Sequence, residues 1–556
     1  MRWLLVALLA VSGAFTVFPL ALQGPAMFAW DDTEYVTQAL ETFEHVNDHG
    51  LVSWPGYIAR HQLVKPPLYV NTLTAALLVF GRERGALAAG VVGGVTVVLL
   101  GIVVFWLVSR LTNGRVGLAA TAGMLALPCV SRWFPLAYTD AQLCVLTLLA
   151  VGLLCVSAER WSRGRILLLG LTVGLGLLAK TTFLMFLVLP AGYWLLRGGD
   201  GRAPIRHRVS VGVQAAVVAA LVASTWYVTQ GEGALYYARV SSGFQLGPVA
   251  EGAFGRAQEW FALFAGRGWG YFLIVIAGIG IVAAVMNRAG GGGRVVGPGE
   301  PGVGAGGGQA TAHPGDYAVM LGLSALPMLL FAVWSHVPPN TRHPLPSLVL
   351  VAVALLIFAL SQVDRSRSRR VLWPICLGVI GIQFAVVTAS QYPPVAGAIQ
   401  QRGLTRRVAR LAPGLEENRP VSVEAASRVL DRARAMLSRP GAPTEWYLSG
   451  ATGFLNVSRL IMLAKLQNVR VSFLWGSYFT WSDADRSAKR AEMRSKSCVV
   501  ILYEPIVAPG TDMADLNRYN AETRAFVTDP ANGFEPVGEP IATETYSLAL
   551  FVRRSG

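Results

Sequence analysis

Adjacent carboxylates stand near the start of the sequence, just after its first apolar segment. They are Asp31 and Asp32, followed by Thr33. A carboxylate at a membrane–water boundary can act as a general base on a hydroxyl group, and two adjacent carboxylates can instead hold a divalent metal together with phosphate oxygens. A structural role is also open, because an Asp before the helix expected at residues 33–46 would cap its N-terminus. Both roles are compatible if Asp32 or Thr33 caps the helix and Asp31 faces a cavity.

Positive side chains outside the apolar runs suit a phosphate group. Lys65 precedes Pro66 and Pro67, which hold the backbone in an extended turn, and a Lys so placed is a compact cation for a phosphate. Lys180 lies between two apolar runs. Arg342 can bind a phosphate through two hydrogen bonds. The structural alternatives are a Lys65 that meets lipid headgroups, a Lys180 that snorkels and an Arg342 in an exposed turn.

Two further groups of titratable residues have both functional and structural interpretations. Asp140 follows Thr139 at the mouth of an apolar run, where a lone acid is costly to bury and is therefore a functional candidate. Both residues would also serve as helix N-caps. His45 and His49 have the i, i+4 spacing of a metal pair, but no third ligand follows at a helical spacing, so a solvated helix face is the better interpretation.

The composition is that of a polytopic membrane protein. Of 556 residues, 53% are hydrophobic and 14% are charged, whereas soluble domains carry about 25% charged residues. The net charge of +15 comes mostly from Arg in short clusters between apolar runs. This distribution favours basic loops at anionic lipid headgroups over nucleic-acid binding. The five cysteines show no zinc-ligand spacing, and we expect small apolar roles for them.

Apolar runs recur over residues 1–390 and predict a transmembrane domain. Residues 1–22 fit a retained helix better than a cleaved signal peptide. Further runs lie at residues 88–109, 116–130, 138–157, 166–179, 182–197, 210–229, 270–287, 317–335, 344–361 and 371–390. We therefore expect about eleven transmembrane helices, of which the short runs at 116–130 and 166–179 fit half-spanning segments or the border of a water-filled cavity.

The positive residues predict the orientation of these helices. With a cytoplasmic N-terminus, one set of alternate connections holds the Arg clusters, namely Arg110/Arg115, Arg160/Arg163/Arg165, Arg197/Arg202/Arg206/Arg208, Arg288/Arg294 and Arg365/Arg367/Arg369/Arg370. The other set holds the candidate chemical residues, including a first outer loop at residues 23–87 with interfacial helices. The Gly-rich residues 288–316 are expected to be a flexible cytoplasmic linker. Every candidate residue is thus expected on the periplasmic or extracellular face.

A second domain is expected at residues 391–556. Short β-like runs alternate there with helix-like runs, which is an α/β pattern in a soluble domain of ordinary size. An odd number of transmembrane helices puts this domain on the outer face. The sequence contains no catalytic motif in this region.

Taken together, these motifs resemble those of the polytopic inverting glycosyltransferases of the GT-C type. The nearest branch is the protein O-mannosyltransferases and the lipid A aminoarabinose transferase, and the resemblance covers about residues 1–390. The matching segments are Asp31-Asp32-Thr33-Glu34-Tyr35, Lys65-Pro66-Pro67-Leu68, Thr139-Asp140-Ala141, Gly174 to Lys180 and Arg342-His343-Pro344-Leu345-Pro346. His343 stands where the family usually has Tyr.

The resemblance implies transfer of a sugar from a polyprenyl-phosphate donor to a hydroxyl or phosphate acceptor of a protein, lipid or cell-envelope glycan. It implies Asp31 and Asp140 as catalytic residues, with Asp31 as the base that takes the acceptor's proton. The residues implied to bind substrate are Asp32, Tyr35, Lys65, Tyr69, Lys180, Arg342 and His343. The implied partners are the lipid donor, its acceptor and membrane lipids, without nucleic acid.

Two other functions stay open at this point. A transporter or flippase of lipid-linked sugars would carry charges deep within its helices and an internal repeat, and the sequence shows neither clearly. A metal-dependent enzyme of the oligosaccharyltransferase type would use Asp31 and Asp32 as ligands. No cofactor is certain, and a divalent metal is the open alternative.

Overall fold

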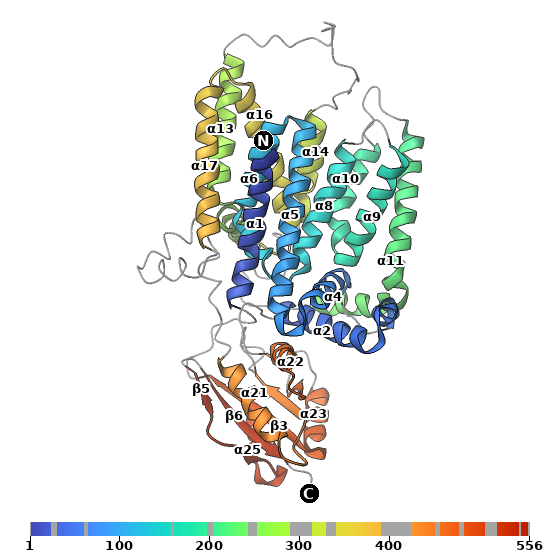
Figure 1. Cartoon of the computed structure of the whole chain (residues 1–556), viewed down its shortest axis with the longest axis vertical. Coiled ribbons are helices and arrows are strands. Elements are labelled where there is room, and N and C mark those ends of the chain that lie inside the picture. The colour runs from blue at the N-terminus through green and yellow to red at the C-terminus, as the bar shows by residue number, and fades with distance from the viewer. Residues whose placement is uncertain are drawn as a thin grey trace.

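The structure, a computed structural model, describes most of the chain. The described residues are 2–23, 31–60, 65–156, 161–196, 204–242, 253–289, 314–329, 341–390, 424–450, 456–476, 483–505, 520–543 and 546–553. They form two parts, a bundle of long helices and a smaller sheet with helices beside it (Figure 1). The N-terminus lies in the helical bundle, and the C-terminus lies beyond the sheet (Figure 1).

The helical part extends from α1 to α17. Its helices are α1 (Arg2–Gln23), α2 (Asp31–His49), α3 (Trp54–Arg60), α4 (Leu68–Phe80), α5 (Gly85–Leu111), α6 (Gly114–Leu125), α7 (Pro128–Trp133), α8 (Thr139–Val156), α9 (Arg163–Ala179), α10 (Phe183–Leu196), α11 (Ile205–Ser242), α12 (Ala253–Leu263), α13 (Tyr271–Ala289), α14 (Pro314–Leu323), α16 (Leu345–Arg365) and α17 (Arg369–Ser390). Shorter helical turns lie at η2 (Leu51–Ser53), η3 (Arg82–Arg84) and η4 (Phe264–Trp269).

Six helices in the described part of the chain are long and apolar enough to cross a membrane. They are Arg82–Leu111, Thr139–Val156, Ile205–Gly233, Tyr271–Arg288, Leu345–Arg365 and Arg369–Ala389. Shorter apolar helices lie at Trp3–Phe15, Leu68–Phe80, Phe183–Leu196 and Val319–Leu329. The chain is thus a multi-pass helical membrane protein, as expected. The described residues do not confirm the expected count of about eleven spans.

Several expected spans form helices shorter than a full crossing. The run expected at residues 116–130 is divided, because Pro128 starts α7 and a proline cannot continue the hydrogen bonds of a preceding helix. Helices α9 and α10 have 17 and 14 residues. Helix α9 ends where Lys180 adopts an extended backbone with φ of −160° and ψ of 139°. Lys180 therefore lies at a helix end, as the sequence indicated.

Small residues let α9 approach α11 closely. A Cβ atom at Gly170 would lie 2.8 Å from the carbonyl oxygen of Ala215, and one at Gly174 would lie 3.0 Å from that of Ala219. Both distances are shorter than a carbon–oxygen contact permits, so only glycine fits. Gly170 and Gly174 therefore serve helix packing.

The first outer connection folds into the helices α2, α3 and α4. Helix α2 packs on α4, where the Thr74 hydroxyl donates to the carbonyl of Ala39 over 3.3 Å. Helix α4 begins directly after Pro67, because the proline lacks an N–H and fits the start of a helix. This arrangement puts the segment that carries Lys65 beside the first turn of α2.

The second part contains a mixed sheet, so the expected α/β pattern is present. Its strands are β1 (Glu445–Ser449), β2 (Ser472–Trp475), β3 (Cys498–Pro505), β4 (Glu535–Pro536), β5 (Ile541–Ala542) and β6 (Tyr546–Arg553). The order is β2-β1-β3-β6-β4, with β5 also paired to β6. Strands β2, β1 and β3 are parallel, and β6 is antiparallel to β3. The accompanying helices are α21 (Glu424–Leu437), α22 (Val457–Leu466), α23 (Asp483–Ser495) and α25 (Asn520–Thr528).

The sheet part packs on the helical part through α22 and α2 (Figure 1). One apolar cluster contains buried residues of both helices, among them Val36 and Leu40 of α2 and Leu460 and Leu463 of α22. Around it, Lys465 lies 3.3 Å from Glu44 and 3.5 Å from Glu41. Helix α2 is thus held between the membrane helices and the sheet.

Candidate functional site

An ion-paired group lies where α8 begins, α9 ends and α16 begins. Lys180 Nζ is 2.6 Å from Asp140 Oδ1, and Arg342 Nε is 3.9 Å from Asp140 Oδ2. The side chain of Asp140 is only 3% exposed, whereas those of Lys180 and Arg342 are 23% and 19% exposed. Each cation therefore remains partly open to a ligand while the carboxylate is enclosed.

Neighbouring residues fix the backbone on which these charges lie. The Thr139 hydroxyl donates to the carbonyl of Ala179 over 2.7 Å, which ties the start of α8 to the end of α9. The Arg342 guanidinium lies 4.6 Å from the centre of the Tyr138 ring, within the range of a cation–π contact. His343 is close enough to Asp140 to interact with it electrostatically. Sequence reasoning gave no role to Tyr138 or to Thr139 beyond capping.

A second group surrounds Lys65. Its Nζ atom lies 2.6 Å from Glu34 Oε2 and 5.0 Å from the centre of the Tyr35 ring. The Tyr35 and Tyr69 rings meet edge to face, with centres 5.6 Å apart. The structure thus brings together Tyr35, Lys65 and Tyr69, which the sequence proposed separately. It also adds Glu34, which sequence reasoning missed although Glu34 stands one helical turn after Asp31.

The two groups lie on adjacent helices. Gln142, two residues after Asp140, donates from Nε2 to the hydroxyl of Thr72 over 2.8 Å. Thr72 follows Tyr69 by three residues, so the first turns of α8 and α4 are in direct contact. Carboxylates and cations from distant parts of the chain therefore meet at one end of the helical bundle.

The structure says less about the predicted carboxylate pair and about the histidine pair. Asp31 and Asp32 are the first two residues of α2, and their side chains lie outside the described residues. The predicted base, cap and metal roles of the pair therefore stay predictions. His45 forms a stack with His49 and Tyr57, with ring centres 4.3 and 4.1 Å apart. Within the described residues, no group of three or more His, Cys, Asp or Glu could hold a metal ion.

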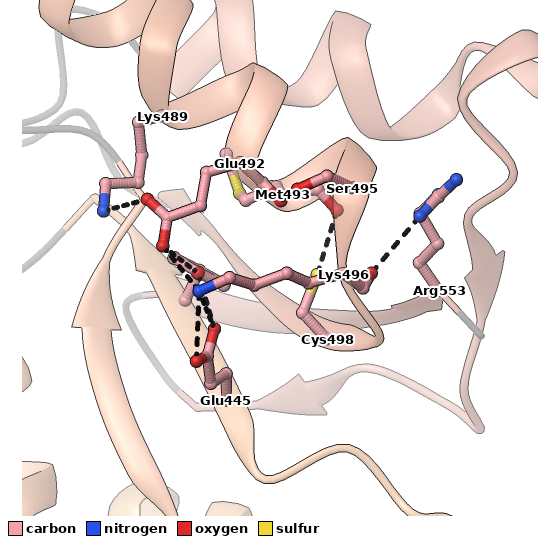
Figure 2. Close-up of polar contacts among 9 residues, drawn as sticks. Glu445, Lys489, Glu492, Met493, Ser495, Lys496, Cys498 and Arg553 are labelled. Carbon is pink, nitrogen blue, oxygen red and sulfur yellow. Dashed lines mark hydrogen bonds and ion pairs between the residues drawn. The ribbon is translucent and has the colours of Figure 1, made fainter. Parts of the chain in front are cut away.

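A further charged cluster lies in the sheet part, where its members satisfy one another (Figure 2). Lys496 Nζ lies 3.1 Å from Glu445 Oε2 and 3.0 Å from Glu492 Oε1, and Lys489 Nζ lies 2.6 Å from Glu492 Oε2. The Tyr447 hydroxyl lies 2.9 Å from Glu445 and 3.1 Å from Glu492. Hydrogen bonds from Lys489 and Lys496 lower the pKa of Glu492 to about 2. This cluster links β1, α23 and the start of β3, so its geometry fits a structural role.

Comparisons with known proteins agree with the fold. A family model described as dolichyl-phosphate-mannose-protein mannosyltransferase matches residues 64–228, a stretch that includes Lys65, Asp140 and Lys180. A search of curated protein sequences finds no significant match.

Solved structures resemble the whole chain. ArnT from Cupriavidus metallidurans in the apo state has a TM-score of 0.57 and 16% identity, covering 98% of this chain and 97% of that one. The same protein bound to undecaprenyl phosphate has a TM-score of 0.57 and 14% identity over the same shares. The apo oligosaccharyltransferase of Archaeoglobus fulgidus has 13% identity over 89% of this chain and 69% of that one, with a TM-score of 0.45, too low to support an inference.

The helical fold and the charged groups at its helix ends fit a polytopic membrane glycosyltransferase, the class that the family model matched over residues 64–228 indicates. Within that class, residues 64–228 match the mannosyltransferase family model, and the whole chain shares the fold of ArnT. The resemblance that the motifs indicated is confirmed at this level.

Proposed function

We propose that this chain transfers a sugar from a polyprenyl-phosphate donor to a hydroxyl or phosphate acceptor at the outer face of the membrane, with inversion at the anomeric carbon. The observation that carries the proposal is the group of Asp140, Lys180 and Arg342 at the ends of α8, α9 and α16. Partly exposed cations there suit the phosphate of a lipid whose tail lies between helices. ArnT, which shares the fold, has been solved with undecaprenyl phosphate bound, and this supports the donor class.

The proposed reaction is a single displacement. The bond between the anomeric carbon and the phosphate oxygen breaks, and Lys65, Lys180 and Arg342 stabilise the negative charge that grows on that oxygen. The acceptor oxygen attacks from the opposite face of the sugar, and Asp31 takes its proton. The products are the glycosylated acceptor, polyprenyl phosphate and a proton held on Asp31.

Asp140 has a positioning role in this proposal. Its carboxylate is enclosed and lies 2.6 Å from Lys180 Nζ and 3.9 Å from Arg342 Nε, so it holds both cations near one another. Glu34 does the same for Lys65 from α2. Direct substrate contacts are assigned to Asp32, Tyr35, Tyr69 and His343 on the resemblance alone.

The proposed membrane topology puts the site on the outer face. Residues 1–390 form the transmembrane domain with about eleven helices. The described residues contain six long and four shorter apolar helices. Residues 391–556 form a domain on the periplasmic or extracellular side. The Gly-rich residues 288–316, most of which lie outside the described residues, are assigned to the cytoplasmic side by the positive-inside pattern. The acceptor is then a protein, lipid or glycan of the cell envelope.

The test uses the full chain in lipid nanodiscs with a panel of polyprenyl-phosphate sugars, and it measures release of polyprenyl phosphate. Asp31→Asn is expected to lower turnover about 10²–10⁴-fold, since it removes the base. Arg428→Gln, an exposed change in α21, is the matched control and should keep full turnover. Full transfer by a folded Asp31→Asn protein would show that the base is assigned wrongly.

Two further arms separate the alternatives. Loss of turnover in EDTA, restored by a divalent metal, would favour the metal-dependent oligosaccharyltransferase type. Movement of labelled lipid-linked sugar across the membrane without its cleavage would favour a transporter. Mass spectra of glycolipids and surface glycans, with and without the protein, identify the sugar and the acceptor.

A further inference from the structure

A buried arginine lies at the end of the bundle opposite Lys180. Arg208 is in the first turn of α11, and only 6% of it is exposed. Its Nη1 atom donates to the carbonyl of Trp194, in the last turn of α10, over 2.9 Å. The Trp194 ring meets the ring of Trp161, which lies just before α9, with centres 5.4 Å apart. Since α9 has 17 residues and ends beside Lys180, this cluster lies about 25 Å from that residue.

The register of α11 turns Arg208 inward. Val211, Ala215 and Ala219 are buried on the same face of the helix, which packs against α9. The preceding residues Arg206 and His207 are exposed. A side chain that merely contributes positive charge to this membrane surface would sit where those two do. Arg208 instead occupies a position in the packing face, where an arginine is costly without a counter-charge.

The buried cluster holds hydrogen-bond donors that the protein does not satisfy. Arg208 Nε, Trp161 Nε1 and Trp194 Nε1 are all buried and have no acceptor in the part of the chain that the structure describes. Among the described residues, no carboxylate forms an ion pair with Arg208. Buried donors in folded proteins are nearly always paired, and a buried guanidinium requires an anion in particular. Because the described residues supply no acceptor for these donors, an external anion would satisfy them.

We propose that the Trp161–Trp194–Arg208 cluster binds the phosphate group of an anionic phospholipid. A phosphodiester offers several oxygen acceptors, and its geometry matches the forked donors of a guanidinium. Tryptophan favours the membrane–water interface, where its ring packs against apolar groups while its N–H reaches a polar one. Exposed Arg206 beside the cluster would attract anionic headgroups to this surface. The lipid completes the packing among α9, α10 and α11, and the site is separate from the proposed catalytic one.

The test compares the full chain in dodecylmaltoside micelles with dioleoyl phosphatidylglycerol, dioleoyl phosphatidylcholine or inorganic phosphate added. Lipid retention is measured by native mass spectrometry and thermal stability by the unfolding midpoint. We expect phosphatidylglycerol alone to be retained and to raise the midpoint. Arg208→Gln should weaken phosphatidylglycerol binding roughly tenfold, because it removes the charge-assisted contacts.

Arg163→Gln is the matched control, because it removes one exposed positive charge from the same surface. It should keep wild-type phosphatidylglycerol binding. Trp194→Phe removes only an indole N–H and serves if Arg208→Gln does not fold, with a smaller but measurable loss of retention expected. Equal phosphatidylglycerol binding by the wild type and both cluster variants would overturn the proposal. An equal midpoint rise with inorganic phosphate would show that the ligand is a free anion and not a lipid.

Discussion

Asp140 illustrates how the site distributes its charges among residues. A carboxylate with one cation at 2.6 Å and another at 3.9 Å, and with almost no exposed surface, has little capacity to accept a proton from a substrate. It can, however, hold two partly exposed cations that would otherwise repel each other. This division of roles makes Asp31, at the start of α2, the better candidate for the base.

The Asp140–Lys180 pair gives the first prediction. Asp140→Asn should destabilise the protein by about 2–3 kcal/mol, because it leaves Lys180 without its charged partner in a largely enclosed position. Lys180→Met in the same chain should recover part of that stability, since it removes the unpaired charge. Turnover should stay at least about 100-fold low in the single and double variants. Unfolding midpoints and donor turnover check both statements, and a double variant with restored turnover would contradict the phosphate role of Lys180.

Glu492 in the sheet part gives a prediction about pH. Its pKa falls from 4.5 to about 2 in the folded protein, with the hydrogen bond from Lys489 as the largest cause. A lowered pKa means stabilisation that is fully present above pH 4.5 and is lost as pH falls towards 2. Glu492 is 32% exposed, so screening limits the effect to about 1 kcal/mol. The midpoint difference between the wild type and Glu492→Gln should therefore shrink from pH 5 to pH 2, and a constant difference would contradict the assignment.

The sequence identified most single residues of the site but not their pairings. Lys65, Asp140, Lys180 and Arg342 stood out because charge next to an apolar run is costly. Nothing in the sequence showed that Asp140 would lie between two cations. Glu34 was missed because a Glu inside an amphipathic helix is ordinary until Lys65 is seen 2.6 Å away.

At the scale of elements, α2 is the helix on which the two parts of the molecule meet. Its first turn carries Asp31, and its later turns pack on α22 through the shared apolar cluster. Glu44 accepts hydrogen bonds from both Arg82 at 3.0 Å and Lys465 at 3.3 Å. The helical part and the sheet part therefore bind the same carboxylate. The interfacial helix was expected from sequence, whereas its docking on α22 was not, because the contacting residues stand more than 400 positions apart.

Lys465 therefore should act on the site through α2. Lys465→Met is expected to lower turnover about three- to tenfold with little change in the unfolding midpoint, since partly exposed ion pairs contribute only about 0–1 kcal/mol while small displacements at a reacting centre reduce rates. The matched control Arg428→Met removes a positive charge whose partner, Glu424, is on its own helix. Lys465→Arg should restore turnover. Unchanged turnover in Lys465→Met would mean that the sheet part does not position α2.

The whole molecule follows the sequence in its outline. The composition and the recurring apolar runs predicted a multi-pass helical protein, and the alternating short runs predicted a C-terminal α/β part; the structure agrees with both. The number of spans was harder to predict, because helix length depends on where packing and prolines end a helix. Pro128 divides one expected span, and α10 has 14 residues. Hydropathy alone does not report either boundary.

The orientation in the membrane is the remaining property of the whole molecule, and cysteine labelling can determine it. All five native cysteines are buried, so the background should be low. In sealed right-side-out vesicles, a membrane-impermeant maleimide should label Arg428→Cys in α21 at once. It should label Arg163→Cys only after permeabilisation, because Arg163 stands in a basic connection that is expected to be cytoplasmic. The reverse pattern would put Asp140, Lys180 and Arg342 on the inner face, so that the donor phosphate would bind on the cytoplasmic side. The proposed transfer at the outer face would then be wrong.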